Sequence, residues 1–237
     1  MSIQKTKDLQ RRMANAGLYF GAIDGVDGPK TQEALKHFDT NKDDERYIFS
    51  DVLWNPTQNY DFKKTKPELV VIHYTACPAY VAISGFKRVQ KKGNRSAHYV
   101  IDTAGNVTQM VTETNRAWHA GASSYKGRSD CNSFSIGIEL ENWGPLAVVK
   151  GSTFTYTGDP FKGAVDEVNG KLWHAYDWVQ VEACAALVAS IKHRHKISDV
   201  VGHEHVSPGR KIDPGPAFPW KEFTELVSGY QQKLEEA

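Results

Sequence analysis

The sequence predicts an α/β (α+β) fold in which one mixed β-sheet is flanked by helices, because strand patterns and helix patterns alternate along most of the chain. The segment PELVVIHYTA at 67–76 is a short valine-rich run, typical of a buried strand. The segment FSIGIELEN at 134–142 alternates apolar and polar residues, which predicts a strand with one covered face. The segment WVQVEACAALVASIKHRH at 178–195 repeats apolar residues, from Trp178 onward, at helical spacing and ends in a basic turn.

The remaining segments complete two expected units, 1–45 and 46–237. Residues 6–38 read as helix, glycine-rich turn and helix, and the polar run DTNKDDER at 39–46 reads as a linker. AHYVIDTAGNVTQMV at 97–111 predicts a hairpin, and KISDVVGHEH at 196–205 predicts a further strand. Residues 144–176 are rich in glycine, threonine and aromatics without a clear period, which predicts an inserted hairpin or long loop.

Charge and hydropathy exclude several classes of partner. The 29 Lys and Arg residues nearly cancel the 28 Asp and Glu residues, so no global positive field favours nucleic acid or anionic lipid. No apolar run approaches the length of a membrane-spanning helix, and the start lacks the apolar core of a signal peptide. We therefore expect a protein that is made in the cytoplasm and does not insert into a membrane. We also expect a monomer. Cys77, Cys131 and Cys184 are too few and too widely spaced for a disulfide framework, so we expect reduced thiols.

Two strand ends carry histidines that are candidates for a metal site. His73 lies near the exit of the valine-rich strand, and His203 follows the strand DVV. Zinc requires three protein ligands, and Asp213 in RKID is a candidate for the third. If that segment is extended, Lys211 and Asp213 lie on the same side. Taken singly, such histidines are more often structural.

A general base is also needed if the site activates water, and two glutamates of one strand compete for that role. Glu139 lies on the polar face of the predicted strand 134–142, and Glu141 lies two residues further on the same face.

Five motifs together strengthen this interpretation: VVIHYTA, SAHYVID, AWHAG, CNSFSIGIELEN and GHEHVSPGRKIDPGPAFPW. In order and spacing they closely resemble the zinc-dependent N-acetylmuramoyl-L-alanine amidases. That family includes muropeptide-recycling amidases, cell-wall amidases and phage lysins, and it is related to the peptidoglycan recognition proteins. The resemblance covers residues 68–222 and implies a catalytic domain at 46–237 with zinc at the exposed cleft of a single mixed sheet.

The resemblance assigns roles to individual residues. It implies His73, His203 and Asp213 as zinc ligands, Lys211 as a catalytic lysine, and Glu139 as the base. One phage branch has a cysteine at the position of Asp213, and other branches have a tyrosine where this chain has alanine at 97, which strengthens the assignment of the base to the glutamate. The implied reaction is attack by zinc-activated water on the lactyl carbonyl that joins muramic acid to L-alanine.

The histidines and aromatics outside this set receive weaker expectations. Three residues are candidates for substrate contact: Tyr74, Trp118 and His119. The second histidine of GHEH, His205, is expected to be a bystander, and His98 is expected to be structural. The surface histidines are expected to be His37, His174, His193 and His195.

The cellular role stays open between two enzymes and a binding protein. LQRRMANAGLYFGAIDGVDGPKTQEALKHF at 9–38 is similar to one half of a small peptidoglycan-binding domain. That unit favours a phage or prophage endolysin, which acts on the peptidoglycan of the cell wall after release and causes lysis. The alternative is a cytosolic muropeptide-recycling amidase that acts on anhydro-muropeptides. A peptidoglycan-recognition module without catalysis is a third possibility, which the complete set of site residues argues against.

Overall fold

The computed structural model describes Thr6 and residues 26–32, 52–88 and 93–236. Most of the expected N-terminal unit at 1–45, His37 included, lies outside the described residues, so its wall-binding role stays a prediction. Within the described part, residues 29–32 are helical. Among the described helices, none combines the length and the apolar character that crossing a membrane requires.

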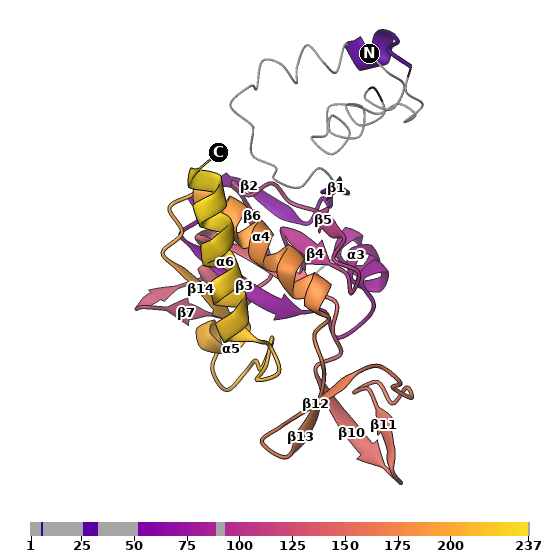
Figure 1. The fold of residues 1–237 in the computed structure, drawn as a ribbon. Coiled ribbons are helices and arrows are strands. Elements are labelled where there is room, and N and C mark those ends of the chain that lie inside the picture. Colours follow the sequence, from indigo (N-terminus) through magenta and orange to yellow (C-terminus); the bar gives the residue numbers. More distant parts are fainter. Residues whose placement is uncertain (1–5, 7–25, 33–51, 89–92, 237) are drawn as a thin grey trace.

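A six-stranded mixed sheet forms the centre of the molecule (Figure 1). Its strand order is β1-β5-β4-β9-β3-β14. The bounds in that order are Leu53–Trp54, Val107–Gln109, Tyr99–Ile101, Ser135–Leu140, Leu69–Tyr74 and Asp199–Gly202. Strands β4, β9, β3 and β14 are parallel, whereas β5 runs antiparallel to β4. The four parallel strands therefore end at one edge of the sheet, the carboxyl edge, and the predicted mixed fold is confirmed.

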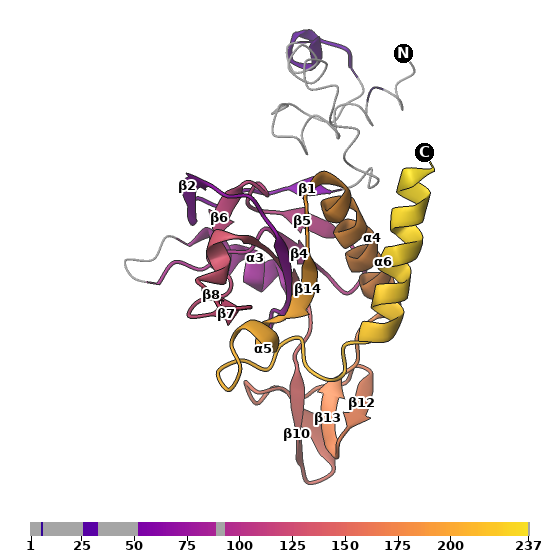
Figure 2. The ribbon, with the colours of Figure 1, turned by 90° about the vertical axis from the view of Figure 1, so that its left-hand side faces the viewer.

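Helices cover both faces of this sheet (Figure 2). Helices α4 (Trp178–Arg194) and α6 (Trp220–Glu235) lie on one face, and α3 (Ala79–Lys87) lies on the other. The main core lies between the sheet and α4 and α6, where β3 and β9 contribute Val70, Ile72, Ile136 and Ile138. Helix α6 was not among the predicted elements, although its buried Phe223 and Val227 are spaced four residues apart, as on one helix face.

The alternation along β9 sends apolar and polar side chains to opposite faces, as the sequence predicted for residues 135–140. Phe134 is an exception, because β9 begins only at Ser135 after the 3₁₀ turn η1 (Cys131–Ser133). Its ring therefore packs into a second cluster on the opposite face. Trp178 also departs from the prediction, since it is the first residue of α4 and is half exposed, with its indole donating to Glu182.

Several short elements surround the sheet. Strand β2 (Tyr60–Lys64) pairs with β6 (Asn115–Ala117), and β7 (Ser124–Tyr125) pairs with β8 (Arg128–Ser129). Helix α5 (His203–Val206) is a single turn directly after β14.

Residues 145–174 form a four-stranded antiparallel sheet, which we call the arm. Its strands are β10 (Pro145–Val149), β11 (Ser152–Phe154), β12 (Val165–Val168) and β13 (Lys171–His174), in the order β11-β10-β13-β12. The arm follows β9 in the element order and extends beyond the carboxyl edge of the central sheet (Figure 1).

Candidate metal centre

Three residues from separate segments meet at the carboxyl edge. His73 is the fifth residue of β3, and His203 is the first residue of α5, directly after β14. Strands β3 and β14 are parallel neighbours in which Gly202 lies opposite Ile72, and a histidine follows each of these two residues in the sequence. Asp213 comes from the loop that follows α5.

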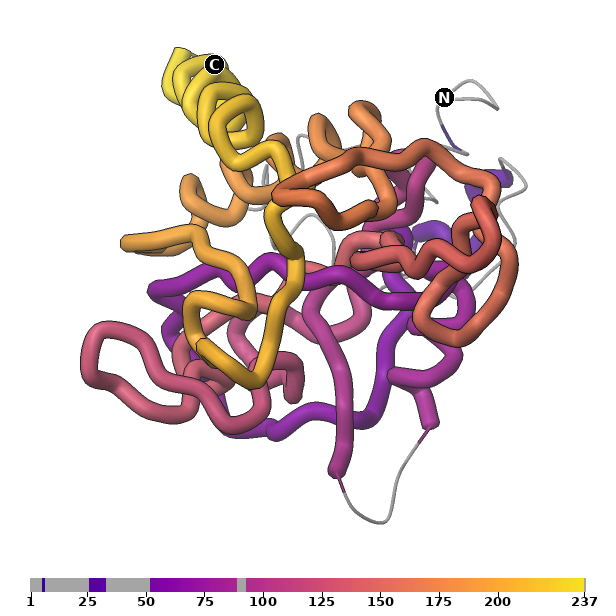
Figure 3. The backbone as a smooth tube through the Cα atoms, turned by 90° about the horizontal axis from the view of Figure 1, so that it is seen from below, coloured from indigo at the N-terminus to yellow at the C-terminus, as the bar shows by residue number. Residues whose placement is uncertain are grey.

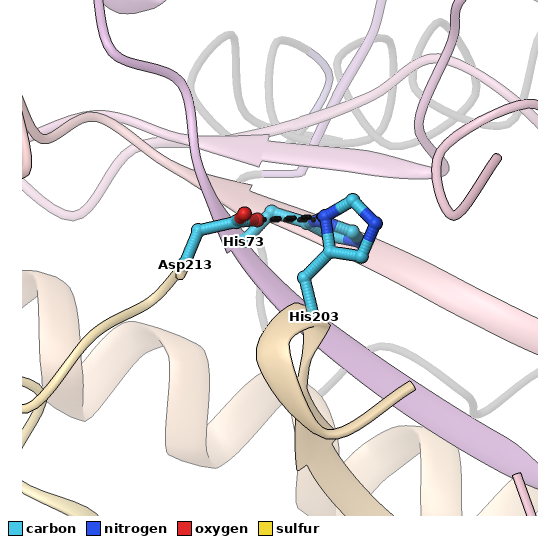
Figure 4. Close-up of side chains that lie close together, drawn as sticks. All are labelled: His73, His203 and Asp213. Carbon is cyan, nitrogen blue, oxygen red and sulfur yellow. Dashed lines mark hydrogen bonds and ion pairs between the residues drawn. The ribbon is translucent and has the colours of Figure 1, made fainter. Parts of the chain in front are cut away.

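The three side chains direct one atom each at a common point (Figure 4). The Nδ1 atoms of His73 and His203 are 2.9 Å apart, and they lie 3.0 and 2.9 Å from Oδ2 of Asp213. Zinc bound at about 2.0–2.1 Å from tetrahedral ligands separates them by roughly 3.3 Å, so the observed triangle is close to that size. All three residues are buried.

The partners of the far nitrogen of His73 determine its tautomer. Oγ of Ser135 lies 2.6 Å from the carbonyl oxygen of Cys131, which can only accept, so this hydroxyl donates there. The same Oγ then accepts from Nε2 of His119 at 3.2 Å, which leaves Nδ1 of His119 as an acceptor. Nε2 of His73, 3.0 Å from that acceptor, must carry the proton. Nδ1 of His73 is therefore left with a lone pair.

The second histidine follows the same logic. Nε2 of His203 lies 3.0 Å from the carbonyl oxygen of Ala120, which can only accept, and 3.4 Å from Nη2 of Arg210, which can only donate. The shorter contact favours a proton on Nε2, which leaves a lone pair on Nδ1. Burial lowers the pKa of His73 to about 4, so this ring is neutral near pH 7. Asp213 adds a carboxylate oxygen that lies 3.0 Å from Nδ1 of His73 and 2.9 Å from Nδ1 of His203. Two lone pairs and a carboxylate thus converge without a shared proton, an arrangement that a bound cation stabilises.

Glycines make room for this arrangement at two points. A Cβ atom at Gly137 would lie 2.3 Å from Cγ of His119, so only glycine lets this ring reach its position beside β9. A Cβ atom at Gly202 would lie 2.6 Å from Oε1 of Glu204 and 2.7 Å from Cδ of Pro214. The backbone at position 202 therefore approaches the Asp213 loop more closely than any residue type other than glycine would allow.

Glu139 and Lys211 lie beside the three ligands. Glu139 is opposite His73 in the β3–β9 register, and the side chains of such neighbours share a face. Within the described part of the chain, no hydrogen bond or ion pair engages its carboxylate. Burial and the charge of Asp213 raise the pKa of Glu139 well above its usual value, and the charges of Lys211 and Arg95 oppose this shift only partly.

The triad opens into a cleft of about 570 Å³. Lys211 and Glu139 line it together with Tyr74 and Trp118, two of the predicted substrate contacts. Tyr74 ends β3, and burial and the charge of Asp213 raise the pKa of its phenol, which stays protonated. The Trp118 ring lies 4.2 Å from the guanidinium of Arg116, and its backbone N–H donates to Ser96.

Other candidates lie away from the common point. Nδ1 of His205 accepts from the backbone N–H of Gly202 at 2.9 Å, and its side chain is exposed. Glu141 follows the end of β9 and is not among the cleft residues. His98 is buried, accepting from the backbone N–H of Gly137 and contacting the carbonyl of Asn115.

Two of the histidines expected at the surface are covered. His174 is buried at the root of the arm, where its Nδ1 accepts from the backbone N–H of Trp143. His195 is also largely covered, and its Nε2 lies 2.6 Å from a carboxylate oxygen of Glu113. Neither position follows from a local pattern, since the partner is remote in sequence in each case. Among the cysteines, Cys131 and Cys184 are buried free thiols, whereas Cys77 lines the cleft.

Sequence reasoning also missed residues that organise the site. Arg210 donates to the carbonyls of Ala120 and Ala122 at 2.6 and 2.9 Å and so joins the loop after α5 to the segment before β7. Ser135 ends the hydrogen-bond chain from His73. The only local signal was the glycine at 137 inside a strand pattern, which indicates a close approach.

Comparison with known proteins agrees with this geometry. The model of the family described as N-acetylmuramoyl-L-alanine amidase matches residues 63–216. The chain belongs to this amidase family. It is 36% identical over 140 residues to the 1,6-anhydro-N-acetylmuramyl-L-alanine amidase AmpD of Citrobacter freundii, which covers 58% of this chain and 60% of that protein. This amidase-family chain thus spans about three fifths of the length of the first curated relatives it matches.

Solved amidase structures share the fold. A crystal structure of an AmpD derivative has a TM-score of 0.53 at 30% identity, covering 78% of this chain and 98% of that one. Escherichia coli AmiD was solved with the substrate anhydro-N-acetylmuramic acid-L-Ala-D-gamma-Glu-L-Lys. It has a TM-score of 0.54 at 30% identity, and the match covers 68% of this chain and 57% of that one. The fold and the family expected from the five motifs are therefore confirmed.

Proposed function

We propose that the protein is a zinc-dependent amidase that hydrolyses the amide bond between N-acetylmuramic acid and L-alanine in soluble anhydro-muropeptides. The observation that carries this proposal is the convergence of His73, His203 and Asp213 on one point beside Glu139 and Lys211. The relatives' names, with anhydro-muramyl substrates, favour the recycling role over the endolysin role that the N-terminal pattern favoured.

His73, His203 and Asp213 are the residues that hold the metal in this proposal. Zinc bound there supplies Lewis acidity, which makes water easier to deprotonate and an amide carbonyl easier to attack. His119 acts as a positioning residue, since it accepts the Nε2 proton of His73 and so keeps the ligand nitrogen unprotonated.

Glu139 is the proposed general base and acid. Its carboxylate takes a proton from the attacking water as oxygen bonds to the lactyl carbonyl carbon. When the carbon–nitrogen bond breaks, the protonated carboxyl returns that proton to the departing amine of L-alanine. A raised pKa suits this exchange, because the group must both accept and release a proton near neutral pH.

Lys211 is the proposed electrostatic partner. Its ammonium group lines the cleft beside Glu139, where it stabilises the negative charge that develops on the carbonyl oxygen during attack. Tyr74 and Trp118 are proposed to contact the substrate from the walls of the cleft.

A comparison of substrates tests the reaction and the role. The zinc-loaded protein is incubated with anhydro-muramyl-tripeptide, muramyl-tripeptide and intact sacculi, and new amino termini and new reducing ends are measured separately. We expect amino termini of L-alanine only, with the highest kcat/KM on the soluble anhydro-muropeptide. Release of reducing ends alone contradicts the amidase assignment, release of neither supports a recognition module, and faster release from sacculi supports the endolysin role.

A further inference from the structure

The arm presents a tyrosine to the cleft that holds the candidate metal centre. Tyr156 lies in the turn after β11 and lines the same cleft as Glu139, Lys211 and the triad. Tyr156 is 67% exposed, so its ring is accessible to a ligand in the cleft. Within the described part of the chain, the arm contributes only this residue to the cleft lining.

The turn that carries Tyr156 is held by its own hydrogen bonds. The backbone N–H of Thr155 donates to the carbonyl of Asp159 at 2.9 Å, and the N–H of Gly158 donates to the carbonyl of Thr155 at 3.0 Å. Oγ1 of Thr157 donates to the Asp159 carboxylate and lies 2.7 Å from Oγ1 of Thr155. The ring is therefore displayed by an ordered turn.

The root of the arm is attached to the segments that carry the proposed ligands. The Tyr74 ring, next to His73 in sequence, packs on Gly144, where a Cβ atom would lie 2.5 Å from the ring. The Trp173 ring packs equally closely on Gly215, and the loop that contains Asp213 passes beside this root (Figure 3).

A hydrogen bond adds to these contacts, because the hydroxyl of Tyr176 donates to the carbonyl of Pro214 at 2.8 Å. The root is thus fixed to the segments of both His73 and Asp213, and the position of Tyr156 relative to the metal centre follows from this packing.

The two parts of the chain contribute different groups to the cleft lining. The central domain contributes charged groups, among them Arg95, Lys211 and Glu139, together with the rings of Tyr74 and Trp118, whereas the described residues of the arm contribute only an uncharged aromatic ring. A substrate cleaved at the muramic acid–alanine bond has a sugar on one side and a peptide with carboxylates on the other. Aromatic faces pack on the C–H faces of sugar rings, and cationic groups pair with carboxylates.

From these observations we infer that Tyr156 forms a sugar-binding wall for the muramic acid ring of the substrate. The inference rests on the proposed amidase function and deepens it, since it assigns the glycan side of the cleft to the arm. Tyr156 contributes binding that the ground state and the transition state share, so its loss raises KM and leaves kcat nearly unchanged.

The test compares Tyr156→Ala, Tyr156→Phe and a control, Tyr80→Ala, in the full-length zinc-loaded protein. Tyr80 is 74% exposed on α3 and does not line the cleft, so it matches the chemistry and the exposure of the change. Kinetics are measured with muramyl-tripeptide and with D-lactoyl-tripeptide, which keeps the scissile amide and lacks the sugar ring.

We expect Tyr156→Ala to raise KM for muramyl-tripeptide by about 3- to 10-fold, the size of one aromatic contact. Tyr156→Ala should leave the KM for D-lactoyl-tripeptide and the kcat values on both substrates as in the parent protein. Tyr80→Ala should keep the KM and kcat of the parent protein on both substrates, and Tyr156→Phe should keep most of the affinity for muramyl-tripeptide. Equal losses on both substrates, or no change on either, would overturn the inference.

Equilibrium binding separates this inference from the proposed function. Muramyl-tripeptide is titrated by calorimetry into Glu139→Gln with and without Tyr156→Ala, so that no turnover is needed. Binding that Tyr156→Ala weakens by about 3- to 10-fold supports the sugar wall even if the parent protein proves inactive. Unchanged binding refutes the sugar wall even if the parent protein is an active amidase.

Discussion

Substitution of Gly137 by alanine tests whether the hydrogen-bond chain behind His73 prepares the metal centre. The new methyl carbon would lie 2.3 Å from Cγ and 2.5 Å from Nδ1 of His119, well inside van der Waals contact. The ring cannot withdraw freely, because it is held at 3.0 Å by His73 and at 3.2 Å by Ser135. The substitution therefore displaces the histidine while every proposed ligand stays in place.

Two terms set the expected magnitude. Overpacking a filled interior costs about 1–3 kcal/mol, which we expect as a loss in the free energy of unfolding of the metal-free protein. Loss of a partner behind a metal ligand weakens binding by about 10- to 100-fold, or roughly 1.4–2.8 kcal/mol. We therefore expect the zinc Kd of Gly137→Ala to rise by that factor.

The zinc Kd is measured by competition with a chromophoric chelator, and the free energy of unfolding is measured by denaturant titration with and without zinc. Gly229→Ala is the matched control, because Gly229 lies in α6 and a Cβ atom added there would meet open space. This control should keep the zinc Kd and gain about 0.5–1 kcal/mol of stability from the better helix propensity of alanine.

A Gly137→Ala protein that binds zinc as tightly as its parent refutes the reasoning about the hydrogen-bond chain. The series of hydrogen bonds from His73 through His119 to Ser135 also predicts different outcomes for two substitutions of His119. An asparagine keeps an acceptor close to the place of Nδ1 and should preserve part of the affinity, whereas alanine leaves the Nε2 proton of His73 without a partner. Equal zinc affinities for these two variants would also contradict it.

Three further predictions follow from the same site and its support. His203→Ala should abolish amide hydrolysis and weaken zinc binding by more than the roughly 100-fold loss expected when a partner behind a ligand is removed. His205→Ala should keep the zinc affinity and the rate of hydrolysis within about threefold of the parent protein. Metal analysis and amine release measure the two quantities. Glu139→Gln should lower kcat by about 10²- to 10⁴-fold. Glu139 must be ionised to act as the base and its pKa is raised, so kcat/KM should fall as the pH falls through that pKa. The charge of Lys211 lowers the pKa of Glu139, so Lys211→Met should shift the acidic side of the pH profile of kcat/KM to higher pH. Glu113→Gln should lower the free energy of unfolding at pH 7 by about 3–5 kcal/mol, since it breaks a buried pair with Arg194.

The Glu113 prediction has a defined pH dependence. Burial alone would raise the pKa of Glu113, but hydrogen bonds from His195 and Arg194 hold it well below its usual range. A depressed pKa contributes stability above the unfolded value of about 4.3, and that contribution is lost as the pH falls toward the folded pKa. The parent protein and Glu113→Gln should therefore converge in stability in acid, and a difference that stays constant down to about pH 2 would contradict this explanation.

Local patterns accounted for the elements whose hydrophobic period is strong. The valine-rich run became β3, the alternating run became β9, and the periodic run became α4. The four strands of the arm were not predicted individually from the sequence. They are short, they are largely exposed, and they pair with one another rather than with the central sheet. The covered positions of His174 and His195 likewise depend on partners that lie about 30 and 80 residues away in sequence.

The sequence by itself determined the family, the mixed fold and the residue types of the candidate site, because five motifs fix the order in which histidine, glutamate, lysine and aspartate follow their strands. The tertiary structure decided which atoms face one another. The tautomers of His73 and His203 depend on carbonyl and hydroxyl partners brought in from other segments. Tyr156 lines the cleft on an arm whose root packs on other segments, through Gly144 and Gly215. Such contacts arise from packing in three dimensions, which no local period encodes.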